Sequence, residues 1–239
     1  MAQAHGGSGG SPILWHIMKN LGGYGIKDSV IAAGYKSNMI EDHFLTYAPL
    51  SNDFDISLGD RDSLKTLGEH DESDWNVTIA FTGDTTETGG RALKASKYLE
   101  PGEDFFLTYG DGLPNVNIDS LKKSHTESGK LATGAVVQPK SRFGVLDLDS
   151  EGNDTSFQEK PQFEGWIKIG FMILNSATPG NFSDNCVLES APLAALAEQG
   201  HRSEYQHNGF WQPVGTLRES KTLNEQWDNG ERPWLDIVD

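Results

Sequence analysis

The chain has 239 residues with 19 Lys and Arg against 35 Asp and Glu, so its formal net charge is −16. That length is sufficient for one large domain with a substantial core. The negative charge argues against a nucleic-acid partner, because neutralising phosphates requires a basic face, but it leaves a small nucleotide open as a ligand. No apolar run approaches the length of a membrane span, so we expect no membrane association.

The cysteine content and the N-terminal residues bear on location. The single cysteine, Cys186, excludes an internal disulfide and fits a reducing compartment. The N-terminus lacks the basic and apolar regions of a signal peptide, so a cytoplasmic location is expected. Residues 1–11 are small, polar and rich in glycine, and we interpret them as a flexible leader or linker. Residues 12–239 are expected to form one domain.

Helical stripes and strand-like runs alternate from residue 12 onward. Pro12 opens a helix that ends at Gly22 and Gly23. The alternation predicts an α/β fold whose sheet is covered by helices on both faces. Further helices are expected at 36–47, 88–98, 118–125, 188–198 and 216–227, and strands at 29–33, 54–58, 75–79, 105–108, 131–137, 166–174 and 204–207. Strands at 144–149 and 155–158 form a predicted hairpin, whereas 59–73 is expected to be a charged loop and 210–213 an aromatic turn.

The central motif is residues 105–112, where a strand-like run leads directly into Tyr109-Gly110-Asp111-Gly112. In open α/β sheets, ligands sit at the carboxyl ends of such strands. A carboxylate between two glycines at that edge can meet a divalent cation, with backbone close enough to touch a phosphate. An ordinary Gly-Asp-Gly turn explains the same residues, and local evidence alone favours that turn.

Two other motifs point to phosphate or sugar recognition. Thr88-Gly89-Gly90-Arg91 opens a helix, where two glycines and an arginine can receive an anion or the edge of a flat base. A plain helix start with a solvated Arg91 is an equal alternative.

The predicted hairpin leads into the adjacent residues Glu159 and Lys160, which cannot share one face of a strand. One of the pair could therefore reach a sugar hydroxyl or a phosphate while the other packs or is solvated.

Six stretches, taken jointly, carry a specific signature: PILWHIM (12–18), TGGR (88–91), TYGDG (108–112), RFG (142–144), FQEKP (157–161) and FWQP (210–213). In this order and at this spacing they resemble the sugar-nucleotidyltransferase family, and within it the glucose-1-phosphate cytidylyltransferases. The resemblance covers nearly everything from Pro12 to about Trp234. It implies a Rossmann-like three-layer α/β/α fold with a predominantly parallel mixed sheet.

The resemblance also implies a reaction, in which CTP and glucose 1-phosphate give CDP-glucose and pyrophosphate. The sugar phosphate attacks the α-phosphorus in line while Mg²⁺ neutralises phosphate charge, so the chemistry is mostly positioning and electrostatics. Homo-oligomers are suggested as well. By motif position, Asp111 is the magnesium ligand and is catalytic together with Lys160. The implied nucleotide residues are Thr82, Gly89, Gly90, Arg91 and Gly110, and the implied sugar residues are Glu159, Lys160 and Gly170.

Several positions depart from the family pattern. The family begins with a central strand and a phosphate-binding loop of the form G-G-x-G-T-R, which residues 1–11 replace. Gly215 stands where a second metal-binding Asp is expected. Lys168 and Ile169 replace an Asn-Gly pair, and Phe81 replaces an Asp. We therefore expect the enzyme to be impaired or inactive in this form, and a non-catalytic sugar-nucleotide-binding paralogue or a gene fragment is the alternative.

The absent first strand has a structural consequence as well. Because it would be a central strand, the sheet must either close up by new pairing or leave two unpaired edges. The strands containing Ile31 and Leu107 are the ones expected to border the break.

Overall fold

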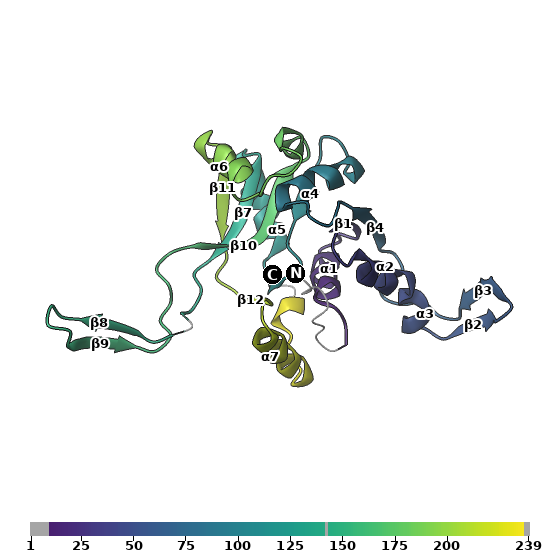
Figure 1. Ribbon diagram of the computed structural model, residues 1–239, viewed down its shortest axis with the longest axis horizontal. Helices are drawn as coiled ribbons and strands as arrows, with labels where there is room; N and C mark the ends of the chain where they lie inside the picture. The colour runs from purple at the N-terminus through teal and green to yellow at the C-terminus, as the bar shows by residue number, and fades with distance from the viewer. Residues whose placement is uncertain (1–9, 142, 237–239) are drawn as a thin grey trace. The chain divides into compact units, whose positions relative to one another are not determined.

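The computed structural model describes residues 10–141 and 143–236 (Figure 1). Most of the predicted leader, residues 1–9, and Arg142 of the RFG stretch lie outside these described residues. The described chain divides into two compact units. The first comprises 21–105 and 175–198, and the second comprises 10–20, 106–174 and 199–236. The chain therefore crosses between the units several times, and each unit is built from segments distant in sequence.

The first unit is built on a parallel pair of strands, β1 (Asp28–Ala33) and β4 (Asn76–Phe81), with Ile31 opposite Ile79. Helix α4 (Thr88–Ala95) packs on β1 and on the 3₁₀ helix η2 (Thr178–Asn181). The remaining elements are α2 (Ser37–Leu45), α3 (Tyr47–Ser51), η1 (Ser96–Tyr98), α6 (Ala191–Glu198) and the hairpin of β2 (Phe54–Ser57) with β3 (Asp60–Thr66).

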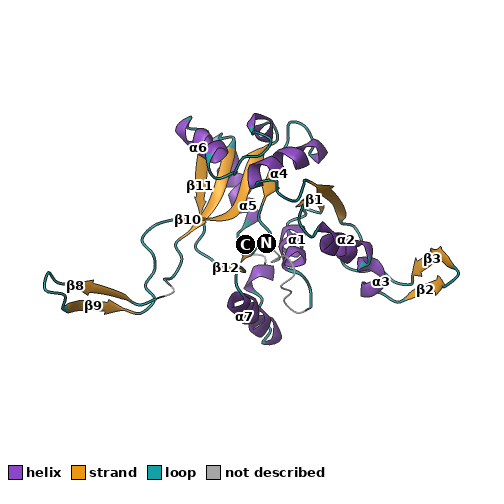
Figure 2. Ribbon diagram, in the orientation of Figure 1, coloured by secondary structure: helices purple, strands orange, loops and turns teal. Residues whose placement is uncertain are grey.

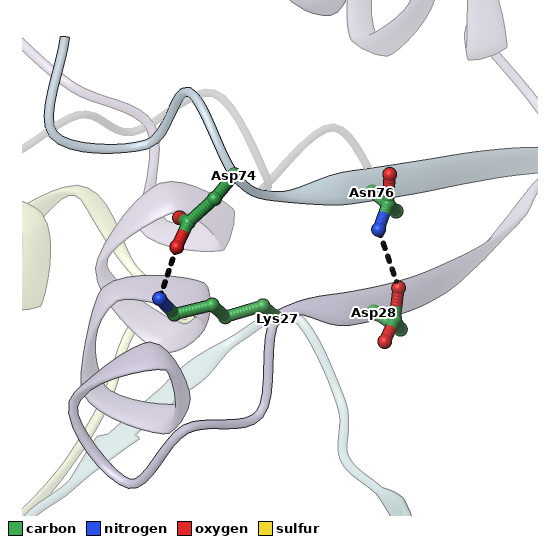
Figure 3. A network of polar contacts seen from close by, with 4 residues as sticks. All are labelled: Lys27, Asp28, Asp74 and Asn76. Atoms are coloured by element: carbon green, nitrogen blue, oxygen red, sulfur yellow. Dashed lines mark hydrogen bonds and ion pairs between the residues drawn. The ribbon is translucent and has the colours of Figure 1, made fainter.

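Polar contacts fix the start of the β1–β4 pair (Figure 3). Lys27 forms an ion pair with Asp74, and its hydrogen bond holds the pKa of that carboxyl below the ordinary value. At the first residue of each strand, the Asn76 amide donates to Asp28 Oδ1 at 2.8 Å. Since a one-residue slip would break both contacts, they specify the strand register.

The second unit contains a mixed four-stranded sheet in the order β11-β7-β10-β5. Its strands are β5 (Asp104–Leu107), β7 (Ala132–Val137), β10 (Ile167–Asn175) and β11 (Arg202–Gln206). The central strand β7 runs parallel to β11 and antiparallel to β10, and all six of its residues are buried. Helix α5 (Ile118–Ser128) packs on β7 and β11, where Ile118 and Leu121 are fully buried.

Two short strand pairs and a helical core complete the second unit (Figure 2). Strand β6 (Gly112–Pro114) pairs with β12 (Trp211–Pro213), and β8 (Val145–Leu148) pairs with β9 (Asp154–Gln158). In the helical core, His16 of α1 (Ile13–Gly23) contacts Trp227 of α7 (Leu217–Asp228) and accepts a hydrogen bond from Trp234 of η3 (Pro233–Leu235). Trp234 is fully buried and ties η3 to this helical core.

The predicted α/β class is confirmed, and three local predictions are wrong. Residues 60–66 form strand β3 instead of a loop, because pairing with β2 outweighs their charged composition. Residues 211–213 form strand β12 instead of only a turn. The helix expected from residue 188 begins at Ala191, which places Pro192 in the first turn, where a proline is tolerated.

The edges of the sheets match one predicted outcome of the absent strand. Among the described residues, β1 pairs only with β4, and β5 stands at the end of its four-stranded sheet. The strands therefore leave two edges and do not close up by new pairing.

No helix in the described part of the chain is long and apolar enough to cross a membrane.

Candidate functional site

Asp111 lies in the short bend between β5 and β6, at the carboxyl end of β5. The β6–β12 pairing continues into this bend, because Val214 N donates to the Asp111 carbonyl at 2.7 Å. That hydrogen bond brings Asp111 beside Gly215, the position where the resemblance expects a second carboxylate. The Asp111 side chain is exposed, so it is accessible to a ligand.

Gly110 and Gly170 fall in the same unit as Asp111. Gly170 has a φ of +77° at the irregularity in β10, and a Cβ atom there would lie 2.6 Å from the Tyr109 ring. Only a glycine allows both this backbone conformation and the close approach of Tyr109. Gly170 thus makes room for Tyr109, which lies two residues before Asp111.

The surroundings of Gly215 are already used by a helix cap. Glu219 Oε2 accepts from the backbone N–H groups of Gly215 and Thr216, each at 2.9 Å, while Glu219 N donates to Thr216 Oγ1 at 3.2 Å. This capping box starts α7. The nearest atom to a Cβ built at Gly215 is Glu219 Oε2 at 3.6 Å, an ordinary contact, so the site has room for a side chain.

The donor set for a metal is small. Within residues 10–141 and 143–236, no group of three or more His, Cys, Asp or Glu side chains is arranged to hold a metal ion. Asp111 offers one exposed carboxylate. Mg²⁺ typically takes one or two carboxylates and completes its shell with water and substrate phosphates. The residues present therefore fit a magnesium ion delivered with a nucleotide, and they do not form a complete protein cage.

Glu159 and Lys160 lie in a bend after β9 has ended at Gln158. The argument from strand faces therefore does not apply to them, which corrects the expectation that the two side chains point in opposite directions. Their charged groups lie 3.7 Å apart, and each side chain is 62% exposed. Lys160 adopts a left-handed φ of +47°, which turns the chain toward Pro161. The ammonium and carboxylate are thus presented together.

Sequence reasoning missed a charged cluster on one face of the second unit's sheet. Strand register places Lys168 opposite Val136 and Glu204 opposite Gly134, while Arg202 forms an ion pair with Glu204. Burial raises the pKa of Glu204, although Arg202 opposes the shift, and burial with the nearby Arg202 lowers the pKa of Lys168. No local sequence signal could have found this cluster, because it depends on the pairing of three strands.

In the first unit, Thr82 and Arg91 meet at the carboxyl ends of β1 and β4. Arg91 Nη1 donates to Thr82 Oγ1 at 2.7 Å and to the Ala33 carbonyl at 3.3 Å, and Nη2 donates to the Asp84 carbonyl at 3.4 Å. The guanidinium lies where a Cβ atom at Gly34 would be, so a side chain at residue 34 would displace it. Arg91 is therefore held in place and is not a freely solvated side chain.

Gly89 and Gly90 are also in the first unit, but their amides are directed at the protein itself. Both N–H groups donate to the Cys186 carbonyl, at 2.8 and 3.3 Å. A Cβ atom at Gly89 would lie 2.9 Å from that oxygen, and one at Gly90 would collide with the Asp184 carbonyl. Close packing therefore explains both glycines, and the first amides of α4 already have an acceptor.

The structure thus groups Thr82 with Gly89, Gly90 and Arg91 in one unit, and Gly110, Asp111, Glu159, Lys160 and Gly170 in the other.

The protein has an α/β fold with candidate ligand residues at the ends of its strands, and comparisons with known proteins specify its family. The family model described as nucleotidyl transferase matches residues 6–228, and the chain belongs to this family. It is 39% identical over 228 residues to a glucose-1-phosphate cytidylyltransferase of Salmonella typhi, covering 95% of this chain and 88% of the relative. The resemblance to the glucose-1-phosphate cytidylyltransferases is thereby confirmed.

Solved structures agree on the fold. HddC from Yersinia pseudotuberculosis superposes with a TM-score of 0.69 at 19% identity, covering 95% of this chain and 90% of that one. A second structure of HddC, complexed with GMP-PN, gives the same TM-score at 18% identity. At this level of identity the likeness supports the Rossmann-like fold alone.

Proposed function

We propose that this chain binds CTP and glucose 1-phosphate and forms CDP-glucose and pyrophosphate. The rate is limited because the metal site has no second carboxylate at residue 215. The observation that carries the proposal is the 39% identity, along 95% of this chain, to enzymes named for that substrate and that transfer. Asp111, exposed at a strand end beside Gly215, supplies the position at which the chemistry would occur.

The roles proposed for individual residues follow from the motif positions. Asp111, together with the nucleotide phosphates, would hold Mg²⁺, which would supply neutralisation of the phosphate charge. Lys160, with its ammonium group exposed, approaches the sugar phosphate, and the adjacent Glu159 accepts hydrogen bonds from sugar hydroxyls. Gly170 is assigned to the sugar by motif position, and its left-handed backbone holds the chain close to the Tyr109 ring. The residues proposed to contact the nucleotide are Thr82, Gly89, Gly90 and Arg91 in the first unit and Gly110 in the second.

Two features support slow turnover. At residue 215 there is no second carboxylate, and the Glu219 carboxylate closest to it caps α7. The 239 residues contain no G-G-x-G-T-R segment. One transition-state electrostatic contact is worth about 3–4 kcal/mol, or roughly 10²–10³ in rate, and such losses are not additive. The same two features favour the alternative, a sugar-nucleotide-binding protein without turnover.

Calorimetric titration tests the proposal. CTP, UTP and CDP-glucose are each titrated with and without Mg²⁺, and Asp111→Asn is the matched control because it keeps the side-chain shape while removing the charge. We expect CTP to bind more tightly with Mg²⁺ in the wild-type chain, and this gain to disappear in Asp111→Asn. Equal binding of CTP with and without Mg²⁺ in both chains would refute the metal role of Asp111.

A pyrophosphate-release assay on the same samples separates the two candidate functions. An enzyme releases pyrophosphate from CTP and glucose 1-phosphate, however slowly, in a manner that depends on Mg²⁺. A binding protein shows affinity for CDP-glucose with no release above the rate of the Asp111→Asn control.

A further inference from the structure

A turn in the first unit is held by two cationic side chains from the same helix. The turn comprises residues 82–86 and follows β4 directly, at the carboxyl ends of the parallel strands β1 and β4. Thr82 is 2% exposed, and both its N–H and its hydroxyl donate to the Ala33 carbonyl at 2.8 Å. Ligands in α/β sheets bind at this kind of edge, so the shape of the turn matters for recognition.

Lys94 spans the turn from one end to the other. Its Nζ donates to the Thr82 carbonyl at 2.8 Å and to Thr86 Oγ1 at 3.0 Å. Thr86 Oγ1 in turn donates to the same Thr82 carbonyl at 2.7 Å. The ammonium thus closes a small hydrogen-bonded ring across the turn. Gly83, at a φ of +104°, allows the tight path, since a Cβ atom there would lie 2.8 Å from Thr86 Oγ1.

Arg91 also contacts Thr82, but through a different acceptor atom. It donates to Thr82 Oγ1, whereas Lys94 donates to the Thr82 carbonyl. Positions 91 and 94 are three apart in α4, so they share a helix face, and two like charges at that spacing repel. The turn stabilises both cations because it supplies separate acceptors: Thr82 Oγ1 and the Asp84 carbonyl for Arg91, and the Thr82 carbonyl and Thr86 Oγ1 for Lys94. The result is a fixed pair of cations at a strand edge of a chain with net charge −16.

We propose that Lys94 is a positioning residue for nucleotide binding. It holds the 82–86 turn and thereby keeps the Arg91 guanidinium at the carboxyl ends of β1 and β4. The proposal rests on the proposed function, because it assumes that a nucleotide occupies this edge. It assigns to Lys94 no direct contact with the nucleotide. Loss of the ammonium would let the turn move and would lower nucleotide affinity without unfolding the unit.

Three variants of the full chain test this role. Lys94→Met keeps the length of the side chain and removes its charge, and Lys94→Arg restores a donor. Lys97→Met is the matched control, because Lys97 is also exposed, lies one turn further along and stacks over Tyr98. CTP affinity is measured by calorimetry in the presence of Mg²⁺, and backbone amide exchange is followed across residues 82–86.

We expect Lys94→Met to weaken CTP binding about tenfold and to speed exchange in the turn, since it removes two hydrogen bonds from a charged donor. Lys94→Arg should recover most of the affinity, and Lys97→Met should match the wild type in both measurements. Unchanged CTP binding and exchange in Lys94→Met, with a wild-type chain that binds CTP, would overturn the role of Lys94 alone. A wild-type chain that binds no nucleotide would overturn this role together with the proposed function.

Discussion

Residue 215 is a glycine, so it has no side chain to offer a metal. Its neighbour Val214 donates a backbone hydrogen bond to the Asp111 carbonyl, which places Gly215 beside Asp111. A carboxylate there would have room, because the nearest neighbour of a Cβ atom is Glu219 Oε2 at 3.6 Å. The capping bonds from Glu219 to the Gly215 and Thr216 amides use the backbone and do not require a glycine. Restoring a side chain at this position is therefore compatible with the start of α7.

We expect Gly215→Asp to raise Mg²⁺-dependent pyrophosphate release from CTP and glucose 1-phosphate by about tenfold or more, because a second carboxylate completes the ligand set that Mg²⁺ prefers. The measurement is a coupled pyrophosphate assay over a range of Mg²⁺ concentrations. Gly215→Asn is the matched control, since it has nearly the same shape and no charge. Equal rates for the two variants would show that a carboxylate at 215 has no catalytic value.

At the scale of the element, the connection between β11 and β12 depends on a buried histidine. His207 is 6% exposed, its Nε2 lies 3.0 Å from the Phe210 carbonyl, and its backbone N–H donates to Val136 of β7. Burial lowers the pKa of His207, and the bond to the Phe210 carbonyl opposes that shift only in part. The neutral imidazole is therefore the form that fits this connection.

A pH dependence of stability follows. A group whose pKa is lower in the folded state contributes stability above its unfolded pKa, here about 6.5, and loses it as the pH falls through the folded value. We expect the free energy of unfolding of the wild type to fall, relative to His207→Gln, as the pH is lowered from 7 through 6.5 and below. Urea unfolding at several pH values measures this difference. Parallel pH profiles for the two chains would rule out His207 as the cause.

Elements with their own apolar period were predictable from sequence, and elements that depend on a partner were not. Strand β10 lies within one residue of its expected bounds because its apolar run is buried. Helix α7 also lies within one residue, since Leu223 is buried and the capping box at Thr216 sets its start. Strand β3 was missed because neither face of the β2–β3 hairpin is buried, so no apolar alternation marks it. The two-glycine start of α4 suggested an anion site, whereas its amides bond to Cys186, a partner that no local pattern reveals.

At the scale of the whole molecule, the described strands are divided among several separate sheets. Among the described residues, β1 and β5 each have a single strand partner, β4 and β10 respectively. Neighbouring amides in a strand point toward opposite edges, so an edge strand leaves every second N–H without a partner in the sheet. The resemblance left two outcomes open, new pairing or two unpaired edges, and the strand order matches the second.

Hydrogen exchange tests these edges. We expect alternate amides in β1, around Ile31, and in β5, around Leu107, to exchange rapidly, while their neighbours are protected. Strand β7 is the internal control, since it is flanked by β10 and β11 and all its amides should be protected. Uniform protection of β1 and β5 at the level of β7 would show that both edges are covered in solution.

The contact between α4 and the Cys186 segment has a consequence for the order in which the chain can fold. The Glu87 amide donates to Asn185 Oδ1 across 98 residues of sequence, and the Gly89 and Gly90 amides meet the Cys186 carbonyl in the same place. At a synthesis rate of about 5–20 residues per second, the ribosome needs roughly 5–20 s to make that intervening stretch. Throughout this interval the start of α4 lacks these native acceptors, so the first unit cannot be completed until after β5, β7 and β10 have been made.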